Sequence, residues 1–153
     1  MSDGPRAIVI EGVPSPSAGP TEPYVLASEH QVLLPYRVAE SEGGGVAVLR
    51  FSSPVAVFQG APNDEALDQH PLWNRGLGFY GVYRVEHSTW REQMQDRGVR
   101  RNTSPPPVWS TPTHYIVTMH DSTFECLATN LAHEVRSETV AHVVARLAGA
   151  PAP

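Results

Sequence analysis

His120 and Glu125 are the two side chains whose types and spacing best suit acid–base chemistry in this sequence. A carboxylate beside an imidazole favours the charged ring and holds its orientation, which suits a general acid or base. Residues diagonal to each other across a β-hairpin are about 7–8 Å apart at the backbone, so their side chains can meet. We therefore predict a catalytic His120–Glu125 pair, with Thr118 and Thr123 beside it as ligand contacts. A polar pair on a solvated sheet face is the alternative interpretation.

The expected pair depends on a β-hairpin formed by residues 114–128. Asp121 and Ser122 form a turn-prone pair between two runs of β-forming residues. A two-residue or four-residue loop around them sets Met119 opposite Phe124, whereas a three-residue loop would mix apolar and polar side chains on each face. Side chains alternate between the faces of a strand, so the even loop leaves one face without a charged residue. The residues of that face are Tyr115, Val117, Met119, Phe124, Cys126 and Ala128.

Other candidate site residues lie earlier in the chain or farther along the hairpin. His114 shares the polar face with His120, but the two are roughly 20 Å apart at ~3.3 Å per residue. That distance is too long for a shared metal ion, so we place His114 outside the predicted site. Residues 59–70 are expected to close over the polar face. The ligand contacts expected from the middle of the chain are His70 and Asp64, with Trp73 and Tyr83 as an apolar wall.

The composition excludes several kinds of chemistry. All 11 basic residues are arginine, so neither Schiff-base chemistry on a lysine nor a P-loop lysine is available. The single cysteine, Cys126, excludes an intramolecular disulfide and CxxC redox or zinc sites. Gly76, Gly78 and Gly81 match the letters of a dinucleotide-binding pattern, but no predicted strand precedes them and no helix follows directly. The HExxH, HxH and HxxxH spacings are missing too, so we expect neither a metal nor a cofactor.

Length and charge limit the class of protein and its partners. A chain of 153 residues with 41% hydrophobic and 18% charged residues is expected to form a single domain, 1–153. A net charge of −5 argues against nucleic-acid binding, and no apolar run is long enough to predict a membrane span. The N-terminus does not resemble a signal peptide, so we expect a cytoplasmic protein, and the arginine-only basic residues suggest a high-GC bacterial source. The expected partner is a small-molecule ligand, and a homodimer is left open.

The hydrophobic pattern predicts an α+β domain, mainly an antiparallel β-sheet that is rolled or forms a half-barrel. A short central helix is expected after Asn63, which is a good N-cap, and a capping box at Thr89 predicts another that ends near Gly98. An amphipathic helix is expected within residues 131–148, either throughout or from Ser137 onward after a strand. Two proline-rich loops are expected at residues 14–23 and 99–113.

Two functions fit these features. The first is a small-molecule-binding domain that acts as an acid–base enzyme through His120 and Glu125, with the site on the polar face of the hairpin. The second is a non-catalytic interaction or regulatory protein, which would use the aromatic segment 73–83 or an edge strand near Pro35. A concave pocket around the His and Glu side chains would favour the first, and a flat face with an exposed aromatic patch would favour the second.

Overall fold

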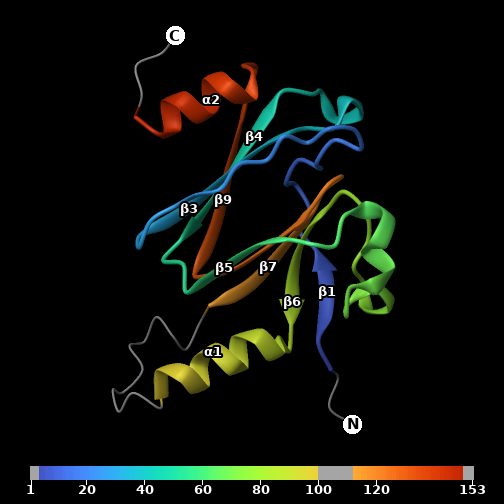
Figure 1. Ribbon diagram of the computed structural model, residues 1–153, viewed down its shortest axis with the longest axis vertical. Helices are drawn as coiled ribbons and strands as arrows, with labels where there is room; N and C mark the ends of the chain where they lie inside the picture. Colours follow the sequence, from blue (N-terminus) through green and yellow to red (C-terminus); the bar gives the residue numbers. More distant parts are fainter. Residues whose placement is uncertain (1–3, 100–111, 150–153) are drawn as a thin grey trace.

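Two antiparallel β-sheets pack face to face in the computed structural model, which describes residues 4–99 and 112–149 (Figure 1). The first sheet has the strand order β1-β6-β7-β8-β5 and the second has the order β2-β3-β4-β9. The strands of the first sheet are β1 (Arg6–Val9), β5 (Ala56–Gly60), β6 (Val82–Glu86), β7 (Thr113–Thr118) and β8 (Thr123–Ala128). Those of the second are β2 (Leu26–Ala27), β3 (Gln31–Arg37), β4 (Val46–Ser52) and β9 (Asn130–Arg136). The predicted α+β class with mainly antiparallel sheet is confirmed.

The chain passes between the two sheets over short connections. Ser52 ends β4 and Ala56 begins β5, while Thr129 alone separates β8 from β9. At these two points consecutive strands continue from one sheet into the other, and neither sheet closes on itself. The strands are thus divided between two layers.

The helices lie at the ends and on the outer side of this sandwich. Figure 1 shows α1 (Thr89–Val99) and α2 (Val140–Leu147) at opposite ends of the molecule. Three short 3-10 helices complete the described elements: η1 (Glu40–Glu42), η2 (Asp64–Gln69) and η3 (Trp73–Arg75). The central helix predicted after Asn63 is η2, and the Asn63 side chain caps it by accepting a hydrogen bond from the Ala66 amide at 3.2 Å. None of the helices described is both long and apolar enough to span a membrane.

The core between the sheets is built from alternating side chains of both layers. The predicted apolar face of the hairpin is confirmed, since all six of its residues belong to this core. Phe51 of β4 reaches across the layers, with its ring centroid 5.2 Å from Phe124 and 5.4 Å from Tyr115. The other face of β4 presents Val46 and Val48 to α2, so this strand is buried on both faces.

Residues 130–148 form a strand and then a helix. The N-cap of α2 is Thr139, whose hydroxyl accepts a hydrogen bond from the His142 amide. A continuous helix from residue 131 is therefore wrong, and the alternative of a strand followed by a helix is correct, with a cap two residues later than Ser137. Leu131 and Val135 are four residues apart, a spacing that fits a helix face and equally one face of a strand. Only pairing with β4 distinguishes the two.

The proline-rich segments lie outside the regular elements. Residues 14–23 form an irregular segment tied to β3, for example by the Ser17 amide donating to the Arg37 carbonyl at 2.9 Å. Of the second predicted loop, residues 100–111 are not among the described residues. Pro35 lies in β3 beyond the end of β2, which pairs only with Val32 and Leu33, so its missing N–H costs no bond to that strand.

The outer face of the first sheet is covered only in part. Leu67, Leu72 and Leu77 from the segment around η2 and η3 pack on Tyr83, Val85 and Ile116 of the sheet. Before β6 begins at Val82, Leu77 packs in the same cluster as Ala7 of β1. At Gly76 the φ angle is +98°, and a Cβ there would collide with the Ala7 carbonyl. The part of this face that carries His114 and Glu125 remains open to a cavity.

Candidate functional site

The pairing register of the hairpin decides which side chain meets Glu125. Thr118 pairs with Thr123, and the four-residue loop 119–122 is closed by the Met119 amide donating to the Ser122 carbonyl. Glu125 therefore lies opposite Ile116, and His114 is its diagonal neighbour. The register is two residues away from the predicted one. A shift of two preserves both faces but replaces every cross-strand neighbour.

His114 and Glu125 form the close polar pair of this face. His114 Nε2 is 2.9 Å from Glu125 Oε1, and the side chains are 7% and 19% exposed. The predicted His120–Glu125 pair is therefore wrong, and His114 takes the place beside Glu125 that was predicted for His120. The cause is the loop: residues 119 and 120 extend the turn rather than the strand, so His120 lies beyond the last paired residue.

Ser88 extends this pair into a chain of three polar groups. It is the residue before α1 and acts as its N-cap, because its Oγ accepts the Arg91 amide at 3.1 Å. The N-cap predicted at Thr89 is therefore Ser88, one residue earlier. The same Oγ is 2.7 Å from His114 Nδ1, and Ser88 itself is buried. The start of α1 therefore places a hydroxyl against the imidazole.

The hydrogen bonds around Ser88 define the protonation of His114. If the Ser88 hydroxyl donates to His114 Nδ1, the proton of the ring lies on Nε2 and is donated to the Glu125 carboxylate. This tautomer places the imidazole between a donating hydroxyl and an accepting carboxylate.

His70 approaches the same carboxylate from the loop after η2. Its Nε2 is 3.8 Å from Glu125 Oε1, and its Nδ1 accepts the Leu72 amide at 3.1 Å. Because Nδ1 is an acceptor, the ring proton of His70 lies on Nε2 and points at Glu125. Two imidazole N–H groups thus converge on one carboxylate oxygen.

The ionised form of Glu125 is stabilised by these two rings. Burial alone would raise the pKa of the carboxyl, but hydrogen bonds and favourable electrostatics from His114 and His70 outweigh it and lower the pKa to about 2. Glu125 is therefore a carboxylate at every physiological pH. It orients His114 and does not itself exchange protons.

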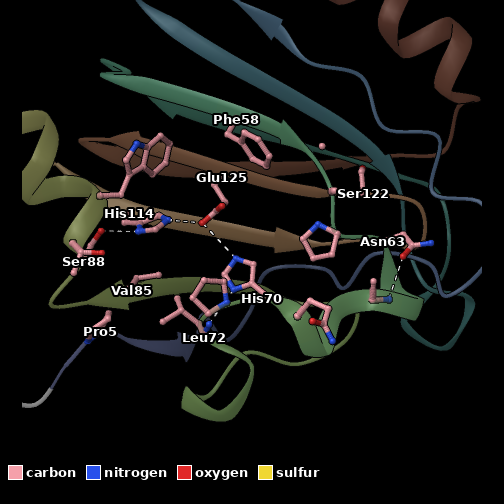
Figure 2. Close-up of a pocket in the computed structure, with 18 of the residues that line it drawn as sticks. Pro5, Phe58, Asn63, His70, Leu72, Val85, Ser88, His114, Ser122 and Glu125 are labelled. Carbon is pink, nitrogen blue, oxygen red and sulfur yellow. Dashed lines mark hydrogen bonds and ion pairs between the residues drawn. The ribbon is translucent and has the colours of Figure 1, made fainter.

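These side chains line a cavity of about 1040 Å³ on the outer face of the first sheet. Figure 2 shows Ser88, His114, Glu125 and His70 linked by hydrogen bonds and ion pairs along one wall, with Phe58 beside Glu125. Apolar parts of the lining come from β5, β6, the start of α1, η2 with the segments on either side of it, and the residue before β1. They are Pro5, Phe58, Ala61, Pro62, Ala66, Pro71, Leu72, Val85 and Trp90. A cavity of this size and mixed lining suits a small organic ligand.

His120 and Asp64 form a separate cluster outside this cavity. Asp64 Oδ2 is 2.7 Å from His120 Nδ1 and accepts the Tyr80 hydroxyl at 2.6 Å. The Tyr80 hydrogen bond is the largest cause that lowers the pKa of Asp64, and the bond to Asp64 is the largest cause that raises the pKa of His120. Neither His120 nor Asp64 lines the cavity. The cluster fastens the start of η2 to the hairpin loop, as does the Asp64 amide donating to the His120 carbonyl.

The remaining predicted ligand contacts have structural partners. The Thr118 hydroxyl donates to the Gly78 carbonyl at 2.8 Å, and that of Thr123 donates to the Pro62 carbonyl at 2.8 Å. The Tyr83 hydroxyl accepts the Gly78 amide, while Trp73 packs edge-on against Phe79 at 5.1 Å. None of these four lines the cavity. Of the eight predicted site residues, the structure brings only His70 and Glu125 into it.

Besides His114, the cavity wall contains Ser88, Trp90 and Phe58, which the sequence analysis did not select. Trp90 packs edge-on against the His114 ring at 5.1 Å. Phe58 lies directly opposite Glu125 in the β5–β8 ladder. Ser88 carried one usable signal, since a serine before Thr89 and three residues before Arg91 is itself a good N-cap. Nothing in the sequence indicated that this N-cap lies beside His114.

The two histidines and Glu125 resemble a metal-binding set in composition, but their hydrogen bonds oppose that use. A metal-binding histidine coordinates through one nitrogen and usually donates an N–H from the other. His70 accepts the Leu72 amide at Nδ1, so its Nε2 keeps the proton. In the described part of the chain, no group of three or more His, Cys, Asp or Glu side chains is arranged to hold a metal ion.

Comparisons with protein-family models, curated proteins and solved structures found no match to this chain.

Proposed function

We propose that this chain binds a small molecule in the cavity and acts on it as an acid–base enzyme, with His114 as the base and Glu125 as its orienting carboxylate. The observation that supports this is the hydrogen-bonded chain Ser88–His114–Glu125 along the cavity wall. A hydroxyl, an imidazole and a carboxylate in hydrogen-bonding sequence is the arrangement that activates a hydroxyl as a nucleophile.

The reaction class that this arrangement supports is hydrolysis of an ester. Ser88 Oγ bonds to the carbonyl carbon of the ester while its proton passes to His114 Nδ1. Glu125 stabilises the imidazolium that forms. The ester C–O bond then breaks, and the leaving alcohol takes the proton from His114. Water repeats the two transfers, releases the acid and restores the Ser88 hydroxyl.

Two backbone amides support the charge that develops on the carbonyl oxygen in this scheme. Thr89 and Trp90 are the first two residues of α1, and both line the cavity. The first amides of a helix have no intrahelical acceptor, and they carry part of the positive end of the helix dipole. They are therefore the available donors for an oxyanion formed beside Ser88.

Hydrolysis of p-nitrophenyl butyrate by matched variants tests this proposal. We expect His114→Ala to lower the rate by about 10²–10⁴-fold, as the loss of a general base does. Ser88→Ala should do the same and should abolish labelling by a fluorophosphonate. His120→Ala is the control, because it removes the same ring from outside the cavity. Equal rates for the parent and His114→Ala, with both folded, would refute the proposal.

A second candidate is the non-catalytic interaction protein, which one observation favours. Phe79 is 52% exposed and packs on Trp73 and Tyr80, so three aromatic rings form a surface patch. Exposed aromatic patches often mark protein interfaces. If the patch joins two copies of this chain, sedimentation should show a dimer for the parent and a monomer for Phe79→Ser.

A further inference from the structure

The cavity holds an ionised carboxylate with one oxygen unused. Both histidine contacts of Glu125 are made by Oε1, and no hydrogen bond or ion pair from the described residues reaches Oε2. The side chain keeps 19% exposure and lines the cavity. Oε2 is therefore available to a ligand group that donates a hydrogen bond or carries positive charge.

The residues around the cavity leave Oε2 without a cationic partner. Among the described lining residues there is no arginine, and Asp121 adds a second carboxylate. The Nε2 atoms of His70 and His114 both face Oε1. Oε2 is therefore free to attract a cationic group that enters the cavity.

An aromatic wall lies beside the carboxylate. Phe58 is the cross-strand partner of Glu125, so both side chains project from the same face of the sheet, and Phe58 is 43% exposed. Its ring leans over Gly60, where a Cβ would meet the ring at 3.2 Å. Trp90 lines the same cavity beside His114. Aromatic faces next to a carboxylate are the combination that binds organic ammonium groups, because the ring quadrupole adds to the attraction of the charge.

We infer that the ligand of this cavity carries an organic cation, an ammonium group seated between the Glu125 carboxylate and the Phe58 ring. This inference rests on the proposed function, since it describes the substrate of the same cavity. It assigns Glu125 two roles through its two oxygens: Oε1 orients His114, and Oε2 receives the cationic group. A substrate would then be an ester whose acid or alcohol part bears the ammonium group.

Titrations with two isosteric probes test the charge requirement directly. Choline and its uncharged isostere dimethylbutanol, in which carbon replaces the nitrogen, have nearly the same shape. Two-dimensional NMR titration of the full chain gives the Kd of each and locates the perturbed amides. We expect choline to bind about tenfold or more tightly than dimethylbutanol, with shifts centred on residues 58, 90 and 125. The anion dimethylbutanoate should not bind.

Two variants and one control link the preference to the named side chains. Glu125→Gln should abolish the preference for choline, and Phe58→Leu, at an exposed position that does not threaten folding, should reduce it severalfold. Asp68→Asn removes a carboxylate of η2 that does not line the cavity and should preserve the preference.

Equal binding of choline and dimethylbutanol, choline shifts outside the cavity, or no choline binding at all would each overturn the inference. None of these outcomes decides the proposed function, because p-nitrophenyl butyrate is uncharged in both of its parts. Hydrolysis of that ester without choline binding would leave the acid–base proposal standing and remove only the cation. If the protein binds choline but does not hydrolyse the ester, the acid–base proposal fails and the cation site stands.

Discussion

Glu125 of β8 accepts a hydrogen bond from His114 of β7 along one diagonal of the hairpin, with Nε2 and Oε1 2.9 Å apart. Both strands lie inside the sheet, paired on either side by β6 and β5. Their backbones are therefore fixed by ladders on both edges, which is the rigid support that a catalytic pair needs. Ser88, the third residue of the Ser88–His114–Glu125 chain, lies outside the sheet. Its position is held by α1, because its Oγ caps the start of that helix.

Replacing Glu125 should change how stability depends on pH. The pKa of Glu125 is about 2 in the folded protein against an ordinary 4.5, so its charge stabilises the fold above about pH 4.5. This contribution, on the order of 3 kcal/mol, is lost as the pH falls through about 2. Urea unfolding of the parent and Glu125→Gln should show a difference at neutral pH that shrinks across that window. A difference that stays constant down to about pH 2 would show that Glu125 is not held ionised.

Truncating Phe124 should destabilise the fold strongly. Its side chain is fully buried and packs on Phe51 between the sheets. Phe124→Ala should cost roughly 3–5 kcal/mol in the free energy of unfolding, as large buried aromatic truncations do. Phe58→Ala is the matched control on the exposed face, where the same truncation should cost much less. A parent-like melting temperature for Phe124→Ala would contradict the packing of the two layers.

Cys126 should be unreactive in the native protein. The residue is fully buried, and burial raises the pKa of its thiol to about 12, so almost no thiolate is present at neutral pH. A thiol reagent such as dithionitrobenzoate should react only as fast as the protein unfolds. Addition of denaturant should release one equivalent at once. Rapid labelling of the folded protein would mean that the apolar face of the hairpin is accessible.

Asp64 should control the titration of His120. The hydrogen bond to Asp64 raises the pKa of His120, so its stabilising effect is present below the ordinary pKa of 6.5 and is lost as the pH rises through the folded value. NMR titration of the His120 ring should give a lower midpoint in Asp64→Asn than in the parent. Asp121→Asn is the comparison, since Asp121 lies 3.9 Å from His120 Nε2 and makes a weaker contact. Equal effects of the two variants would argue against the Asp64–His120 hydrogen bond.

Much of the fold could be predicted because it depends on local patterns. Alternation along residues 115–128 separated the apolar face from the polar face, and all six residues of the first face are in the core. Asn63 signalled the start of η2 through its own side chain. Glu125 was predicted for the site because it is a carboxylate on the same polar face as the histidines, and that face follows from alternation alone.

The partners within the site depend on contacts that the sequence does not encode locally. Two registers of the hairpin give the same faces, and the choice between them exchanges His120 for His114 beside Glu125. That choice is made by pairing with β5 and β6 and by the Thr118 and Thr123 hydroxyls, which bond to Gly78 and Pro62 far away in the sequence.

The sequence by itself determined the α+β class, the faces of the strands and the chemical types present on the polar face, since these follow from residue properties at short range. The tertiary structure alone decided that Ser88, His70 and Phe58 meet His114 and Glu125, because these groups come from four separate elements and a loop. It also decided that His120 pairs with Asp64 instead. Packing of the two sheets and of η2 sets those distances, and hydrogen bonds act only over a few ångströms.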